Sequence, residues 1–136
     1  MARTRLIEVY KDSEHKCDRC GRKHNKVYMV SNNNKIWRVG ATCCKRLFGW
    51  TPTKNEINAG IDRHEARMIL EAIVAQGEPV TKVQPLALSS CTGKISHSMM
   101  RSCRINRMIF EVAKEYDNVK VDGDLYGNDE ITVRIN

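Results

Sequence analysis

The sequence predicts an α+β protein in which a small cysteine-rich finger packs with two longer helices and a C-terminal β-hairpin. Segments rich in β-forming residues recur at both ends of the chain, and two central segments repeat apolar residues at helical spacing. At 136 residues with 41% hydrophobic content, the chain can bury one modest core. We therefore predict a single domain over residues 1–136, with a finger at 17–50 and a scaffold at 51–136.

The finger region begins with strand signals. RTRLIEVY at 3–10 is predicted to be an edge strand. KVYMVS at 26–31 and KIWRVG at 35–40 flank three asparagines, which tolerate left-handed backbone geometry, so these segments predict a β-hairpin. A short helix is expected from Thr42 to Phe48, because Gly49 then stops it.

The scaffold is expected to begin with a helix. Thr53 and Glu56 have the spacing of a capping box. Gly60 weakens the helix and Asp62 offers a second cap, so the region to residue 76 is either one flawed helix or two in series. An apolar stripe at helical spacing is predicted to be core, and its members are Ala66, Ile69, Leu70, Ile73 and Val74.

Three further elements complete the scaffold. VTKVQPLAL at 80–88 predicts an edge or irregular strand, because Pro85 interrupts it. Apolar residues at helical spacing predict a helix over about 98–116. NVKVDG at 118–123 and EITVRI at 130–135 alternate in polarity around a loop rich in Gly, Asn and Asp, which predicts a final hairpin.

The positive charge of the chain is concentrated in its first third. The formal net charge is +7, and residues 1–50 hold 12 Lys and Arg against 4 Asp and Glu. Such a field attracts polyanions, so DNA or RNA is the leading partner and an acidic protein surface is the next. The chain has no apolar run long enough for a membrane span and no apolar signal-peptide core, so we expect a cytoplasmic protein, in the host cytoplasm if it is phage-encoded.

The cysteine spacing points to a metal. Cys17 and Cys20 are separated by two residues and followed by a glycine, a spacing that lets a tight turn direct both thiolates at one ion. Cys43 and Cys44 follow the predicted hairpin and open the predicted short helix. In a cytosolic protein this pairing favours metal binding over disulfides. A buried packing role or a redox role for the first pair are the alternatives.

The stretch from residue 17 to residue 50 resembles the treble-clef-type zinc modules found in small proteins of phages and other mobile elements. Those modules run knuckle, hairpin, then Val-Gly-x-x-Cys and a helix, as Val39 to Cys43 do here. The resemblance implies a structural Zn²⁺ on Cys17, Cys20 and Cys43. It covers about a quarter of the chain and implies little about a biochemical role.

The fourth ligand departs from the usual pattern, because Arg46 occupies the place of a second helix cysteine. Cys44 is the leading choice, although adjacent helical residues point about 100° apart. The remaining possibilities are His24, His15, Cys91, Cys103 or no protein ligand. Cys91 and Cys103 are expected mainly to pack or to remain free.

Basic and aromatic residues surround the predicted metal site. We expect phosphate contacts and base stacking from the residues that flank the knuckle and the helix start. The candidates are Arg22, Lys23, Lys45, Arg46 and Trp37. The competing interpretation is that the charges are simply solvated and the tryptophan is core.

Catalysis is not supported by any motif. The hairpin lacks the histidine pair of treble-clef nucleases, which makes that class less favoured, and no phosphate loop, deaminase motif or metalloprotease motif occurs. The leading hypothesis is a non-enzymatic zinc-finger protein that contacts nucleic acid, as an accessory factor of a phage or mobile element. The rival is a protein-binding modulator or inhibitor of a host enzyme, which would use the basic finger or the acids between Asp117 and Glu130.

Overall fold

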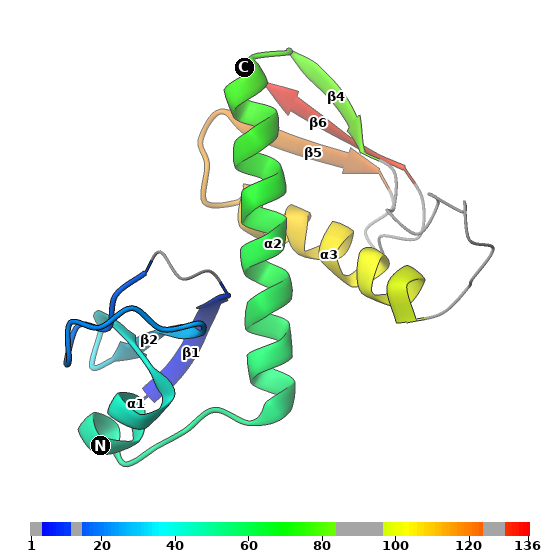
Figure 1. Cartoon of the computed structure of the whole chain (residues 1–136). Helices are drawn as coiled ribbons and strands as arrows, with labels where there is room; N and C mark the ends of the chain where they lie inside the picture. The colour runs from blue at the N-terminus through cyan, green and yellow to red at the C-terminus, as the bar shows by residue number, and fades with distance from the viewer. Residues whose placement is uncertain (1–3, 12–14, 84–96, 124–129) are drawn as a thin grey trace. The chain divides into compact units, whose positions relative to one another are not determined.

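The structure is a computed structural model that describes residues 4–11, 15–83, 97–123 and 130–136. Over these residues the chain is α+β, as predicted, with three helices and two antiparallel three-stranded sheets. It forms two compact units, Met1–His64 and Glu65–Asn136, shown in Figure 1. The boundary falls inside helix α2 (Lys54–Gln76), beyond the end of the predicted finger at residue 50.

The sheet of the first unit has the order β1-β2-β3. It consists of β1 (Thr4–Tyr10), β2 (Val27–Asn32) and β3 (Lys35–Val39). The predicted edge strand and the predicted hairpin are both confirmed. Asn33 and Asn34 form the hairpin turn with φ of 50° and 66°, the left-handed region that asparagine tolerates better than most residues.

Helix α1 (Ala41–Phe48) follows β3 directly, within one residue of the predicted start. Gly40 is its N-cap in extended geometry. Gly49 ends the helix with φ of 61°, and its backbone N–H donates to the carbonyl of Lys45. A left-handed residue at this point costs least for glycine, which explains why the helix stops there.

Helix α2 begins with the predicted capping box. The backbone N–H of Thr53 donates to Glu56 Oε1 at 2.9 Å, and the backbone N–H of Glu56 donates to Thr53 Oγ1 at 3.2 Å. The bond at Thr53 also lowers the pKa of the Glu56 carboxyl. Of the two possibilities left by the sequence, the structure has one continuous helix, and Asp62 is buried within it instead of starting a second one.

Gly60 weakens a helix by its propensity, but here it allows close packing of α2 against β1. A Cβ at this position would lie 2.8 Å from Val9 Cγ2 and 3.2 Å from the backbone N of Val9. The absence of a side chain therefore lets the first half of α2 approach the backbone of β1 closely. This contact brings Ile57 and Ile61 onto the core of the first unit.

The core of the first unit is small and rich in cysteine. Its buried members are Val9, Cys17, Tyr28, Val30, Val39, Cys43, Cys44 and Ile61, and Trp37, Phe48 and Trp50 are partly buried against them. Leucine and isoleucine, the usual large core residues, contribute little here. The fold of this unit therefore depends strongly on what the cysteines do.

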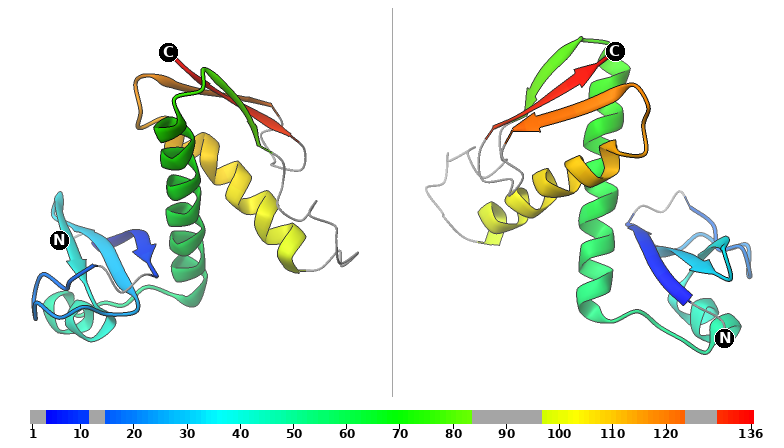
Figure 2. Two further views of the ribbon diagram at one scale, coloured as in Figure 1. Left: turned by 45° about the horizontal axis from the view of Figure 1, so that its top comes forward. Right: turned by 180° about the vertical axis from the view of Figure 1, so that it is seen from behind.

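The second unit combines a sheet with helices, as Figure 2 shows. Its sheet has the order β4-β6-β5, from β4 (Val80–Val83), β6 (Ile131–Ile135) and β5 (Val119–Gly123). The predicted C-terminal hairpin is confirmed by the antiparallel pairing of β5 with β6. Pairing of β4 with β6 adds the third strand, and the rest of the segment predicted after β4, including Pro85, lies outside the described residues.

Both predicted apolar stripes form the core of the second unit. Helix α3 (His97–Ala113) matches the predicted helix over about 98–116, ending slightly earlier. The buried residues of its hydrophobic cluster are all aliphatic: Ala66, Leu70, Ile73, Ile105, Ile109, Val112, Ala113, Val119, Ile131 and Val133. Arg67 on α2 binds Glu115 just after α3 at 2.7 Å, which adds a polar link to this packing. No helix in the described part of the chain has the length and hydropathy of a membrane span.

Candidate metal centre

A tight turn brings the first two cysteines together. The backbone N–H of Cys17 donates to the carbonyl of Arg22 at 2.9 Å, and that of Gly21 donates to the carbonyl of Cys17 at 2.8 Å. Gly21 has φ of 72°, so the turn uses the left-handed geometry that glycine adopts freely. The result is a knuckle over residues 17–21 that orients both thiols.

The knuckle is tied to the end of β3 by a reciprocal pair of hydrogen bonds. The backbone N–H of Asp18 donates to the carbonyl of Arg38 at 2.6 Å, and the backbone N–H of Arg38 donates to Asp18 Oδ2 at 2.7 Å. This pairing fixes the knuckle beside Gly40 and the start of α1. The next cysteine, Cys43, lies in the first turn of that helix.

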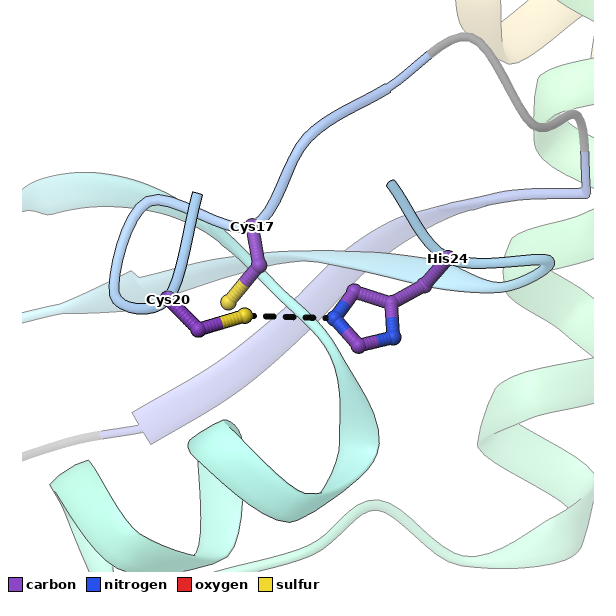
Figure 3. A group of neighbouring side chains, drawn as sticks. All are labelled: Cys17, Cys20 and His24. Carbon is purple, nitrogen blue, oxygen red and sulfur yellow. Dashed lines mark hydrogen bonds between the residues drawn. The ribbon is translucent and has the colours of Figure 1, made fainter. Parts of the chain in front are cut away.

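His24 completes the group that faces the two knuckle cysteines. The ligand atoms of Cys17, Cys20 and His24 all lie within 4.8 Å of one another, and Cys20 Sγ lies 3.4 Å from His24 Nε2. Figure 3 shows the Cys20 sulfur directed at a nitrogen of the His24 ring, with the Cys17 sulfur beside that of Cys20. These three side chains could therefore bind a metal ion.

The distances fit a tetrahedral site. With metal–sulfur bonds of about 2.3 Å and metal–nitrogen bonds of about 2.0 Å, neighbouring ligand atoms are separated by about 3.5–3.8 Å. Cys20 Sγ and His24 Nε2 lie 3.4 Å apart, close to that spacing, and all three ligand atoms lie within 4.8 Å of one another. Thiolate and imidazole are also the donor set that suits zinc and other soft or borderline metals.

The backbone prepares Cys17 to act as a thiolate. Burial raises its pKa, but hydrogen bonds from the backbone N–H groups of Cys20, Gly40 and Arg19, together with the Cys43 side chain, bring it down to about 7. Hydrogen bonds of this kind stabilise the charged sulfur that a metal requires.

Cys20 behaves in the opposite way. The largest single effect, a hydrogen bond from the backbone N–H of Arg22, lowers the pKa of Cys20. Desolvation and the neighbouring thiols of Cys17 and Cys43 together outweigh it, so the pKa of Cys20 is raised overall. Accumulating several thiolates in one place is unfavourable unless a cation offsets their charge. A divalent cation would offset the charge of such a group of thiolates.

Cys43 borders the same cluster. It is 6% exposed, its thiol influences the pKa values of both Cys17 and Cys20, and Arg19 Nη1 donates to its Sγ at 3.5 Å. Cys43 was predicted to be a ligand, and it lies near the knuckle thiols but outside the group whose ligand atoms are all within 4.8 Å of one another. Arg19 adds a positive charge beside the sulfurs.

Gly40 sets the position of the His24 ring. A Cβ at Gly40 would lie 3.1 Å from both Cδ2 and Nε2 of His24. Gly40 has ordinary extended geometry, so its backbone would accept alanine. The ring contact explains why this position suits glycine, and it also identifies Gly40 as a residue that supports the cluster.

Cys44, the leading candidate for the fourth ligand, is not brought into the cluster. It is fully buried, and its Sγ donates to the carbonyl of Trp50 at 3.4 Å. Burial raises its pKa to about 11, which holds it as a neutral thiol. Adjacent residues on α1 point in different directions, and with Cys43 beside the knuckle, Cys44 points into the apolar core.

Three further candidates for the fourth ligand are not part of this group or lie outside the described residues. The ring of His15 stacks on Tyr10 with centroids 3.9 Å apart. Cys103 is half-buried on α3 in the second unit, and Cys91 falls outside the described residues. Of the histidines and cysteines considered for this position, His24 is the one that the structure places with Cys17 and Cys20.

The predicted basic contacts are solvent-accessible. Arg22 and Lys23 follow the knuckle, Lys45 and Arg46 lie in the last turn of α1, and all four are exposed. Trp37 is partly buried: Phe48 packs edge-on at 6.0 Å between centroids, and Lys35 Nζ lies 4.4 Å from the ring centroid. A nucleobase would have to displace Lys35 to stack on that face.

The acids near the C-terminus are partly neutralised within their own sheet. Asp122 binds Arg134 at 3.4 Å, and Glu130 lies 3.8 Å from Lys82. Asp117 is exposed, whereas Asp124 and Asp129 lie outside the described residues. These ion pairs weaken the idea that this hairpin acts as a phosphate mimic for a protein partner.

Comparisons of the chain with protein-family models, curated proteins and solved structures found no match. The assignment of a metal, and of a role for it, therefore rests on the residues and their geometry.

Proposed function

We propose that this chain is a non-enzymatic zinc-finger protein that contacts nucleic acid through the basic surface of its first unit. The observation that carries the proposal is the convergence of Cys17, Cys20 and His24 within a segment whose exposed flanks are strongly basic. In this proposal Cys43 supplies the remaining ligand.

The proposed ligand set argues for a structural role of the metal. Four protein ligands fill a tetrahedral zinc site. A catalytic zinc instead needs one open position for a water or a substrate. Three thiolates and a neutral imidazole around Zn²⁺ give a net charge of about −1. Arg19, which donates to Cys43 Sγ, offsets that charge.

Metal binding would connect the two basic segments. Arg22 and Lys23 lie directly after the knuckle, and Lys45 and Arg46 lie on α1, which begins just before Cys43. A shared ion would fix the knuckle to α1 and so fix the relative positions of these cations. Phosphate contacts gain from such preorganisation, because the side chains then lose less freedom on binding.

The test is binding of labelled duplex and single-stranded oligonucleotides by the full chain, measured by fluorescence anisotropy over a range of salt. We expect log K to fall linearly with log salt, and we expect the R22Q/K23Q double variant to bind more weakly with a shallower slope. The matched control is R107Q/K120Q, which removes two exposed cations from the second unit.

Two outcomes would contradict the proposal. One is an affinity for nucleic acid that is absent or independent of salt. The other is an equal loss of affinity in R22Q/K23Q and in R107Q/K120Q. Such a result would indicate that binding depends on the total charge of the chain and does not use a site on the finger. In either case a protein partner would become the leading function, and affinity capture with the full chain would be the next step.

A further inference from the structure

The first unit contains a small pocket on the side of β1. Its volume is about 250 Å³, and it is lined by Arg5, Leu6, Ile7 and Arg63. Three of these residues are consecutive on β1, and the fourth comes from α2, far away in the sequence. Two arginines and no acid line the pocket, so it favours an anion.

A β-bulge explains how three consecutive residues line one pocket. Successive side chains in a regular strand point to opposite faces. The pairing of β1 with β2 shifts between Leu6 and Glu8, which leaves Ile7 without a partner in the register. Bulges bend edge strands and redirect side chains, and they are common beside binding sites.

A buried carboxylate holds the second arginine in place. Arg63 Nε lies 3.8 Å from Glu8 Oε1, and His64 Nδ1 lies 3.2 Å from Glu8 Oε2. The Glu8 side chain is fully buried, whereas that of Arg63 is 26% exposed. Glu8 therefore lies close to Arg63 on the protein side, and Arg63 also lines the pocket.

We propose that this pocket binds one phosphate group of the nucleic-acid backbone, through Arg5 and Arg63. The inference rests on the proposed function and adds a phosphate contact that neither the metal site nor the basic flanks provide. The planar fork of a guanidinium suits two oxygens of a phosphate, and a pair of such groups from two directions fixes its position.

The size of the pocket supports a phosphate over a larger ligand. Sites for drug-sized molecules usually span about 300–1,000 Å³, and this pocket, at about 250 Å³, is smaller. Leu6 and Ile7 offer an apolar wall that suits the adjoining sugar. The proposed contact is made to a phosphate, so it is expected to be independent of base sequence.

The first measurement is the salt dependence of duplex binding by R5Q. Arg5 is exposed, so this variant is expected to fold normally. Loss of one phosphate contact reduces the slope of log K against log salt by about 0.9. R5K keeps the charge and is expected to retain the slope, and R107Q in the second unit is the control. A slope for R5Q equal to that of the unaltered chain would overturn the proposal.

A second measurement separates the pocket from the proposed function. The full chain is titrated with inorganic phosphate while the side-chain NMR signals of Arg5 and Arg63 are followed. Saturable shifts of both signals that disappear in R5Q support a phosphate pocket, even if no oligonucleotide binds and the proposed function fails. The absence of such shifts, in a chain that does bind oligonucleotide, would overturn the pocket and leave the function standing.

Discussion

The two units of this protein are stabilised in different ways. The second unit has a core of aliphatic side chains from α2, α3, β5 and β6. The first unit buries three cysteines among its eight core residues, and a fourth, Cys20, is exposed beside them. The comparison teaches that one half of the chain can fold on apolar burial, whereas the other half needs an additional source of stability, which we propose to be a metal ion.

Removal of the metal has the largest expected effect. Chelation should unfold the first unit, because the ion would no longer hold the knuckle cysteines, His24 and Cys43 together and too little apolar surface remains. Amide NMR signals of Val9, Val30 and Val39 should collapse, while those of Ile109 and Val133 stay dispersed. If both units lose their signals together, or if neither does, the contrast between them is wrong.

The variant L70A should destabilise the second unit and leave the metal site of the first unit intact. Leu70 is fully buried in the aliphatic core, so its truncation should destabilise that unit by about 2–5 kcal/mol. Chemical denaturation followed at residues of the second unit measures this loss. Metal stoichiometry should remain unchanged. M68A, at an exposed position of the same helix, is the control and should be nearly neutral.

The close contact at Gly60 predicts an intermediate effect on the first unit. G60A places a Cβ against Val9, including its backbone, and should destabilise the first unit by about 1–3 kcal/mol despite a better helix propensity. N58A, at an exposed position of the same helix, should instead be neutral or slightly stabilising. Thermal unfolding of the two variants provides the measurement, and a G60A chain as stable as N58A would remove the packing argument.

The smallest effect is expected at the start of α2. T53A removes the side-chain acceptor for the backbone N–H of Glu56 and should cost about 1 kcal/mol. The loss of the capping box can be followed in the amide signal of Glu56, which should exchange with solvent faster in T53A. T51A, an exposed threonine just before the helix, should change neither stability nor exchange at Glu56.

Local features could be predicted from the sequence, and features that depend on distant contacts could not. The asparagine turn, the capping box and the C-terminal hairpin each follow from a few adjacent residues, and the structure confirms them. The addition of β4 to β6 joins strands far apart in the chain, and alternation of side chains says nothing about which strands pair.

The candidate site shows the same division. The spacing of Cys17 and Cys20 was sufficient to predict the knuckle, whereas the structure groups His24, and not Cys43, with these two cysteines. The sequence favoured Cys44 over His24 because Cys44 is adjacent to Cys43. Two contacts that sequence spacing does not reveal favour His24: the thiol of Cys44 donates to the carbonyl of Trp50, and the ring of His24 packs over Gly40. The pocket of Arg5 and Arg63 likewise depends on a tertiary contact.

The most direct test of the account is a Co²⁺ titration of the full chain and of variants at the cysteines and histidines. Visible absorption reports tetrahedral geometry and the presence of thiolate ligands. We predict about one ion per chain, loss or marked weakening of binding in C17S, C20S, C43S and H24A, and retained binding in C44A and H15A. Retained binding in H24A together with loss in C44A would contradict the assignment of the metal site.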